Sequence, residues 1–386
     1  MSAEIYLPSI MQIGAGAIKH LPKVLENLAV QRPCIITDNT MLELGVVKKL
    51  QEILLAHHID VAVFSEVMQE PDDKSIAIAT SMVAEGNFDC IIALGGGSAI
   101  DSAKAIALLA THGGHMRDYK VPLLIRQQSM PVIAIPTTAG TGSECTRVTI
   151  ICDSVSSEKM LCMGPGLMPK AAIVDYELTL TVPFRVAADT GIDALTHAIE
   201  AYVSKKASLF TDQHATSAMK LIAQNLLEAC FQPDHREAKE AMMLGSCMAG
   251  IAFSNASVAL VHGMSRPLGV HFHVPHGLSN AMLLPTITAF SLSGNPRKYA
   301  ECALHMGLID TIVDEAACHR ALIDFLTMIN KKLKVPSMTE YGIVKADYID
   351  VLDTMAEQAL ASGSPSNNPL VPTFEQIKQL YVQVYT

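Results

Sequence analysis

The sequence predicts an α/β domain built on a parallel, doubly wound sheet, followed by an all-helical domain. In the first half, short β-branched runs alternate with helical stretches, which is typical of a parallel sheet whose strands are joined by helices. After Pro183, long helical segments follow one another with few β-rich runs. A chain of 386 residues also exceeds the size that one hydrophobic core usually supports. We therefore expect two domains, 1–184 and 185–386.

The strands expected in the first domain are the β-rich runs 33–37, 61–65, 90–95, 131–136 and 171–175. The intervening stretches 41–58, 75–86 and 98–111 have helical periodicity. A sheet of this kind binds its ligands at the carboxyl ends of the strands. We expect the active site to lie there, in the cleft between the two domains.

Charge and composition exclude several classes of protein. The net charge of -10 and the absence of a dense Lys/Arg run argue against nucleic acid as a partner. We find neither a signal peptide nor an apolar stretch long enough to span a membrane. The nine cysteines are scattered without a C-x-x-C pair, so reduced thiols are expected. The sequence therefore favours a cytoplasmic enzyme that acts on a small molecule.

A glycine-rich turn follows the run 90–95 and leads into the helical stretch from 98. Gly95, Gly96 and Gly97 allow close approach of a pyrophosphate, Ser98 is expected to cap the helix, and the helix N-terminus favours an anion. An ordinary glycine-rich turn is the alternative, but the order of strand, glycines and helix favours nucleotide binding. By contrast, the upstream Gly14-Ala15-Gly16 lacks a clear preceding strand and is interpreted as a turn into the first helix.

Two further features support a dinucleotide. Asp38 follows the first predicted strand, where a carboxylate either binds a ribose 2′-hydroxyl, which selects NAD over NADP, or caps the next helix. A second loop, 136–144, also follows a strand and is rich in glycine and short hydroxyl residues that suit phosphate and ribose.

Four residues in the helical half are candidate metal ligands. Asp193 and His197 are spaced so that both lie on one face of a helix, although such a pair is common on protein surfaces. The segment 262–276 adds four histidines, with His262 and His276 at its ends and His271 and His273 between them. Three imidazoles and a carboxylate suit Fe²⁺ or Zn²⁺. The other histidines of the chain that we considered, His57, His58, His112 and His115, are interpreted as structural or solvent-facing.

Taken together, these motifs resemble the iron-containing (group III) alcohol dehydrogenase family over nearly the whole chain. The resemblance rests on GGGSAIDSAK (95–104), PTTAGTGSE (136–144), the D-x-x-x-H at 193–197, HGMSRPLG (262–269) and VPHGLSNAMLLP (274–285). It implies a metal site of Asp193, His197, His262 and His276. For the cofactor it implies NAD bound by Asp38, Gly96, Gly97, Ser98, Asp101, Thr137, Thr138, Thr141, Ser143, Lys159 and Leu178. A homodimer or larger homo-oligomer is also implied.

One residue departs from the family pattern. Many members have a histidine, proposed to assist proton transfer, where this chain has Arg266. Arginine stays protonated near neutral pH and cannot act as a base, so His271 and His273 are the nearby titratable candidates for the proton path. The guanidinium of Arg266 either binds an anionic group of the substrate or forms an ion pair with a carboxylate of the helical domain.

The predicted activity is the interconversion of a small primary alcohol or diol and its aldehyde, with NAD and one divalent metal, Fe²⁺ or Zn²⁺. A polyol dehydrogenase similar to glycerol dehydrogenase is one alternative, and a non-catalytic relative that binds NAD and metal is another.

Overall fold

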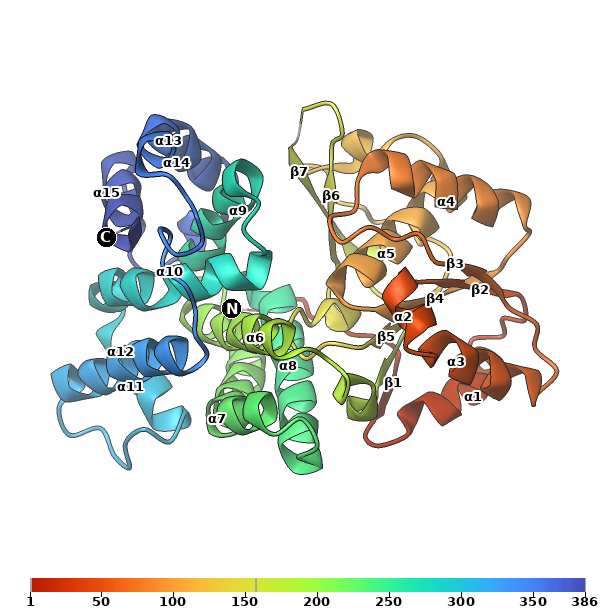
Figure 1. Cartoon of the computed structure of the whole chain (residues 1–386), viewed down its shortest axis with the longest axis horizontal. Helices are drawn as coiled ribbons and strands as arrows, with labels where there is room; N and C mark the ends of the chain where they lie inside the picture. Colours follow the sequence, from red (N-terminus) through yellow and green to blue (C-terminus); the bar gives the residue numbers. More distant parts are fainter. Residues whose placement is uncertain (1, 157, 386) are drawn as a thin grey trace. The chain divides into compact units, whose positions relative to one another are not determined.

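The computed structural model describes residues 2–156 and 158–385, so the predicted domain ends at 1 and 386 lie outside the described residues. The chain divides into two compact units, one formed by Glu4–Val182 and the other by the chain from Pro183 onward together with the first residues (Figure 1). The two units are described in turn.

The first unit contains a six-stranded sheet in the order β1-β8-β5-β4-β2-β3, in which every pair of neighbours is parallel. The strands are β1 Ile10–Ile13, β2 Pro33–Ile36, β3 Ala62–Phe64, β4 Cys90–Gly95, β5 Val132–Pro136 and β8 Ala171–Val174. The predicted parallel sheet is therefore confirmed. The helices are α1 Leu21–Asn27, α2 Asn39–Glu43, α3 Val46–Leu55, α4 Asp73–Glu85 and α5 Gly97–His112.

Both faces of this sheet are covered, which explains why its inner strands β8, β5, β4 and β2 are apolar throughout. In β4, Ile91 and Ala93 join an apolar cluster on one face with residues of α4 and α5. The alternate residues Ile92 and Leu94 join a second cluster with residues of α1 and α3. Alternating side chains of one strand therefore enter two separate cores, as expected in a doubly wound sheet.

Two expectations about the helices and strands of this unit were wrong, and one pair of strands was missed. The helix expected over 41–58 is broken at Gly45, whose φ of 71° ends α2 before α3 begins. Strand β1 directly precedes Gly14, although no clear strand was expected there, while the expected turn into the first helix is present. The antiparallel hairpin β6 Val148–Cys152 and β7 Lys159–Met163 was not predicted.

The second unit contains helices and no strand among its described residues, which confirms the predicted all-helical half. Its helices are α6 Phe184–Val203, α7 Leu209–Phe231, α8 Arg236–Ala256, α9 Leu260–Phe272, α10 His276–Ser291, α11 Pro296–His305, α12 Glu315–Lys332, α13 Lys345–Asp350, α14 Leu352–Ala361 and α15 Phe374–Tyr385. Short 3-10 helices are η1 Ala17–His20, η2 Met116–Tyr119, η3 Ser143–Cys145, η4 Pro165–Leu167, η5 Tyr176–Thr179, η6 Leu292–Gly294 and η7 Ser364–Asn367.

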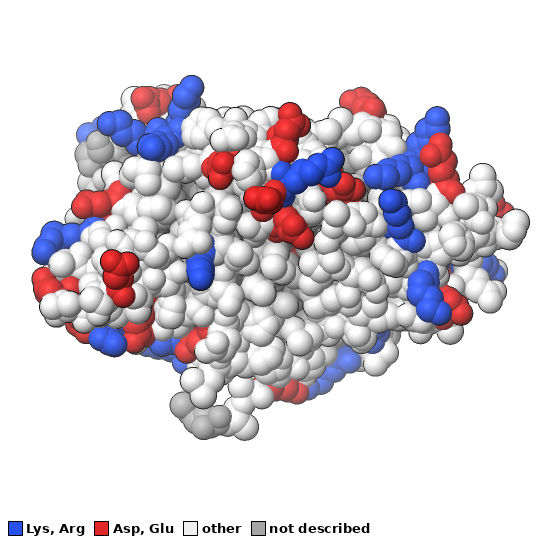
Figure 2. All heavy atoms as spheres, turned by 90° about the horizontal axis from the view of Figure 1, so that it is seen from below, with Lys and Arg blue, Asp and Glu red and all other residues white. Residues whose placement is uncertain are grey.

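None of the described helices is by itself long and apolar enough to cross a membrane, and only the pair α8 and α9, bent by 101°, meets the length and composition criteria together. On the face seen in Figure 2, acidic and basic side chains are interspersed among wide uncharged areas.

Candidate metal and cofactor sites

Helix α6 presents three functional side chains on one face. Asp193, His197 and Glu200 are separated by four and three residues, so successive turns of the helix carry them in line. All three are buried, although charged side chains are seldom fully buried without a partner. This row of buried polar groups therefore requires partners from neighbouring helices.

Glu200 connects α6 to the start of α9. Its carboxylate accepts hydrogen bonds from the backbone N–H groups of Ala259 at 2.8 Å and Val261 at 2.6 Å, at the N-terminus of α9. It also lies 2.7 Å from Nδ1 of His262, the third residue of that helix. A carboxylate accepts hydrogen bonds, so Nδ1 carries a proton, and Nε2 is the ring nitrogen that faces Asp193 and that a metal would bind. Glu200 thus fixes both the helix end and the tautomer of His262.

The Nε2 atoms of three histidines converge on Oδ1 of Asp193. The distances are 3.9 Å from His197, 3.3 Å from His262 and 3.8 Å from His276. One ligand atom from each of the four residues lies within 4.8 Å of the others. Ligands around a tetrahedral ion at metal distances of about 2.1 Å are about 3.4 Å apart, so this spacing fits one divalent ion. The structure therefore brings together the four predicted metal ligands.

Asn280 lies inside this group, one helical turn after His276 on α10. Its Nδ2 lies 2.6 Å from Oδ1 of Asp193, 3.2 Å from Nε2 of His262 and 3.3 Å from Nε2 of His276. Its Oδ1 is buried and has no hydrogen-bond partner among the described residues. One donor group thus faces three electron-rich atoms, which is the environment that a cation would occupy. The residues present therefore fit a divalent metal.

The electrostatics of the group agree with this description. Burial by itself would raise the pKa of Asp193, but the neighbouring His197 and His276 and the bond to His262 lower the pKa well below its ordinary range. Burial would lower the pKa of His262, yet its bonds to Asp193 and Glu200 raise that pKa to about 9. Asp193 is therefore held as an anion by its surroundings.

The three histidines differ in exposure. The side chains of His197 and His262 are 6% and 3% exposed, whereas that of His276 is 38% exposed. The ring of His197 is stacked between Phe253, with centroids 4.1 Å apart, and His262, with centroids 4.4 Å apart. The buried rings are fixed by packing, and the group opens on the side of His276.

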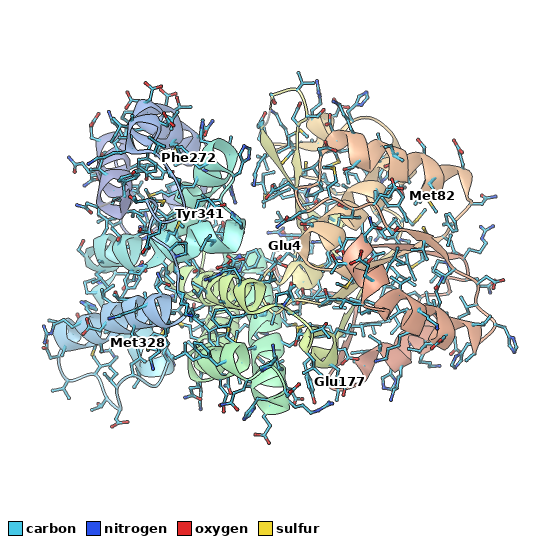
Figure 3. The ribbon with its side chains drawn as sticks, viewed as in Figure 1. Glu4, Met82, Glu177, Phe272, Met328 and Tyr341 are labelled. Carbon is cyan, nitrogen blue, oxygen red and sulfur yellow. The ribbon has the colours of Figure 1, made fainter. Side chains whose placement is uncertain are left out.

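His271 and His273 do not join this group. Nε2 of His271 lies 3.0 Å from Oε1 of Gln358 in α14, and His271 is not among the residues whose ligand atoms gather around Asp193. His273 is exposed, has a φ of 54°, and its carbonyl accepts a hydrogen bond from the hydroxyl of Tyr341. Figure 3 shows Tyr341 near Phe272, the last residue of α9. Proton transfer through His271 and His273 stays a prediction, and the geometry does not favour it.

The two predicted cofactor loops lie side by side in the first unit. Because β4 and β5 are paired in parallel with Gly95 opposite Pro136, the loops that follow them start at the same level. A Cβ built on Gly96 would lie 3.6 Å from Thr138, and one built on Gly97 would lie 2.8 Å from Cγ2 of Thr141. A glycine is therefore required at position 97 for the two loops to approach this closely.

The start of α5 is open to an anion, but not in the way expected. Gly96 is the N-cap and its helix end receives no side-chain cap, whereas Ser98 lies inside the helix and donates to the carbonyl of Gln69. The prediction that Ser98 caps the helix was wrong, because the helix begins at Gly97, before Ser98. The uncapped N–H groups of the first turn suit a phosphate.

Asp38 caps a helix and also lies beside the glycine-rich turn. Its side chain caps α2 by accepting from the N–H of Met41 at 3.2 Å. Its Oδ2 also lies 3.4 Å from where a Cβ of Gly95 would be, so the carboxylate adjoins the glycine-rich turn. The hydrogen bond that caps α2 therefore leaves the carboxylate of Asp38 beside the glycine-rich turn.

Other candidate cofactor residues have mainly internal partners. Oδ1 of Asp101 accepts from Oγ of Ser143 at 2.6 Å and Oδ2 accepts from the N–H of Ile150 at 2.9 Å. Nζ of the buried Lys104 donates to the carbonyl and hydroxyl of Ser143. Asp101 and Ser143 therefore hold the second loop against α5 rather than presenting free polar groups.

The remaining cofactor candidates, Lys159, Leu178 and Thr137, differ in their surroundings. Nζ of Lys159 pairs with Glu70 at 2.8 Å, and Leu178 packs into the apolar cluster beside α1 and α3. Thr137 is buried and its N–H bonds the carbonyl of Gly95. These contacts assign none of the three residues a role toward the cofactor.

Sequence reasoning missed Glu200 and Asn280. Glu200 continues the spacing of Asp193 and His197 along α6, and Asn280 repeats that spacing after His276, so extending each pattern by one turn finds both.

Comparisons with known proteins agree with these sites. Residues 8–176 match the model of the iron-containing alcohol dehydrogenase family, and residues 187–385 match the model of its C-terminal domain.

The chain is 34% identical to the NAD-dependent methanol dehydrogenase of Bacillus methanolicus, covering 98% of each chain. The crystal structure of 1,3-propanediol oxidoreductase has a TM-score of 0.95 and 32% identity, with 100% of both chains covered. A sulfoacetaldehyde reductase from Bifidobacterium kashiwanohense, solved with NAD⁺, has a TM-score of 0.89 and 25% identity, with 100% of this chain and 99% of that chain covered. The chain therefore belongs to the iron-containing alcohol dehydrogenase family, whose members use NAD and a divalent metal to act on alcohols and aldehydes.

Proposed function

We propose that this enzyme interconverts a small primary alcohol or diol and its aldehyde, and that Asp193, His197, His262 and His276 hold its divalent metal. The observation that carries this proposal is the convergence of three Nε2 atoms on one carboxylate oxygen at 3.3–3.9 Å. The methanol and 1,3-propanediol enzymes among the relatives support a short substrate.

When bound, the metal supplies Lewis acidity toward an alcohol or aldehyde oxygen, and NAD(H) accepts or donates the hydride. The chain's own residues prepare this chemistry. Glu200 keeps the proton of His262 on Nδ1, so Nε2 remains a ligand, and Phe253 stacks on His197 and shields that ring. The exposed edge of His276 is the side from which a substrate would enter.

For the cofactor, we propose that the open N-terminus of α5 and the loop containing Thr138 and Thr141 bind the pyrophosphate of NAD(H). The uncapped first turn of α5 and the close contact of the two loops support this assignment. Asp38, beside the glycine-rich turn, would favour NAD over NADP.

We further propose that the enzyme acts in the cytoplasm as a homodimer or larger homo-oligomer, without nucleic-acid or membrane partners. The net charge of -10 supports the absence of nucleic acid.

The proposal is tested by measuring metal content and by following NADH absorbance with a panel of short alcohols and aldehydes in both directions. Asp193→Asn should abolish stoichiometric binding of Fe²⁺ or Zn²⁺ and reduce activity to background. Asp189→Asn is the matched control, because Asp189 lies one turn earlier on α6 and pairs with Arg185 instead. Full metal content and activity in Asp193→Asn, or no turnover of any substrate by the metal-loaded protein, would contradict the proposal.

A further inference from the structure

Arg266 lies in α9 four residues after His262, so the two side chains leave the same face of the helix. Four residues correspond to a rise of about 6 Å along the helix axis, which is within the length of an arginine side chain. A permanent positive charge is therefore placed one turn from the metal-ligand group.

This guanidinium has no fixed partner. The residue is only partly exposed and its Nε is fully buried, yet no hydrogen bond or ion pair to Arg266 is found in residues 2–156 and 158–385. Burial lowers the pKa of Arg266, while the carboxylate of Glu200 acts in the opposite direction. A buried guanidinium N–H usually bonds a carboxylate or a carbonyl, and the Nε of Arg266 does not.

The ion-pair interpretation is not supported. Glu200 is the carboxylate whose charge acts on Arg266, but its two oxygens already accept from Ala259, Val261 and His262. Arg185 in α6 differs at its terminal nitrogens, which donate to two backbone carbonyls and pair with Asp189, although its Nε is buried without a partner as that of Arg266 is. Arg266 is thus left with donors that no described side chain uses.

The charges around the site favour an anion. A divalent cation with Asp193 would leave one positive charge, and the charges of Glu200 and Arg266 cancel in number although the two side chains form no ion pair, so a bound monoanion would bring the net charge of the group to zero. The planar guanidinium donates in pairs to carboxylate, sulfonate or phosphonate oxygens. A neutral alcohol with no acceptor at that end would leave the buried Nε of Arg266 without a partner.

We propose that Arg266 binds an anionic group at the end of the substrate opposite the reacting carbon, so that the preferred substrates are short aldehydes, and the corresponding alcohols, that carry a carboxylate, sulfonate or phosphonate. This inference rests on the proposed function, because it assigns the substrate class of the same site.

The first experiment compares matched substrates with the metal-loaded enzyme and NADH. The anionic substrates are 4-oxobutanoate, 2-oxoethanesulfonate and 2-oxoethylphosphonate, which distinguish the three anions, and the neutral ones are butanal and the methyl ester of 4-oxobutanoate. We expect the wild type to have a kcat/KM at least about 10-fold higher for one anionic substrate than for the neutral ones, since a charged hydrogen bond changes affinity by this order. Equal or lower kcat/KM for all three anions would overturn the inference.

The second experiment uses Arg266→Gln, Arg266→Lys and the control Arg320→Gln, whose side chain is 69% exposed on α12. Arg266→Gln should lower kcat/KM for the anionic substrate by about 10- to 100-fold, mainly through KM, and change it little for butanal. Arg266→Lys should restore part of the loss, and Arg320→Gln should behave as wild type. Equal losses for charged and neutral substrates, or an effect on the KM of NADH alone, would contradict substrate binding by Arg266.

A third measurement does not depend on turnover. Ethanesulfonate and butanoate, which cannot be reduced, should bind wild type in calorimetry and raise its melting temperature, and both effects should be lost in Arg266→Gln. If no aldehyde is turned over but this binding is found, the proposed function fails while the anion site stands. If neutral aldehydes are reduced but neither anion binds, the anion site fails while the proposed function stands.

Discussion

The carboxylate of Glu200 lies 2.7 Å from Nδ1 of His262 and at the same time accepts two backbone N–H groups from the start of α9. One side chain of α6 therefore determines where α9 begins, how the ring of His262 is turned and which of its nitrogens is free. This relationship explains how residues far apart in the chain are held as one ligand group.

Replacing Glu200 by glutamine should weaken metal binding by about 10- to 100-fold, because the ring of His262 loses the charged acceptor that fixes its orientation. Competition with a chelator, followed by metal analysis, measures this affinity. Glu357→Gln, at an exposed position of α14, is the matched control and should retain wild-type affinity. Unchanged metal affinity in Glu200→Gln would show that the contact does not support the ligand.

Gly97→Ala should weaken NADH binding by about 5- to 100-fold, because the added Cβ would lie 2.8 Å from Cγ2 of Thr141 and push the two loops apart. NADH fluorescence titration measures the change. Adding Thr141→Ser removes the methyl group in the way and should recover part of the affinity. If the double variant binds no better than Gly97→Ala, the contact between the loops is not the cause.

Asp38→Asn should reduce the preference for NAD over NADP, measured as the ratio of the two kcat/KM values, by about 10-fold, because the charge that repels a 2′-phosphate is removed. Asparagine is as good an N-cap as aspartate, so the cap of α2 and the melting temperature should be retained. Asp72→Asn, the same substitution at the N-cap of α4, is the control and should leave the ratio unchanged. An unaltered ratio in Asp38→Asn would remove Asp38 from cofactor selection.

Glu144 should make the stability of the protein dependent on pH. Burial raises its pKa from 4.5 to about 7. Because the folded value lies above the unfolded one, the stabilisation is fully present below about pH 4.5 and is lost as the pH rises through about 7, by at most about 3 kcal/mol.

Denaturant unfolding at about pH 5 and about pH 8 checks this expectation. Glu144→Gln is neutral throughout, so it should lose less stability than wild type between the two conditions. The same loss in both proteins would assign the pH dependence to other groups.

The sequence by itself predicted the fold class and the four candidate metal ligands that the structure brings together. Strand and helix alternation follows from local periodicity, and His262 and His276 stood out because four histidines fall within one short segment. Sequence periodicity was a weaker guide where the chain turns. The break between α2 and α3 depends on one residue, Gly45, in a left-handed conformation, and the β6–β7 hairpin depends on pairing between two strands, which local periodicity does not reveal.

Tertiary structure alone decided which partners the functional residues have. It separated His271 and His273 from Asp193, engaged Asp101 with Ser143, and placed Asn280 among the ligands. It also left Arg266 without a carboxylate, because Glu200 is occupied by the start of α9. The physical reason is that spacing along a helix fixes which face a side chain occupies, whereas hydrogen-bond partners depend on residues brought together from distant segments.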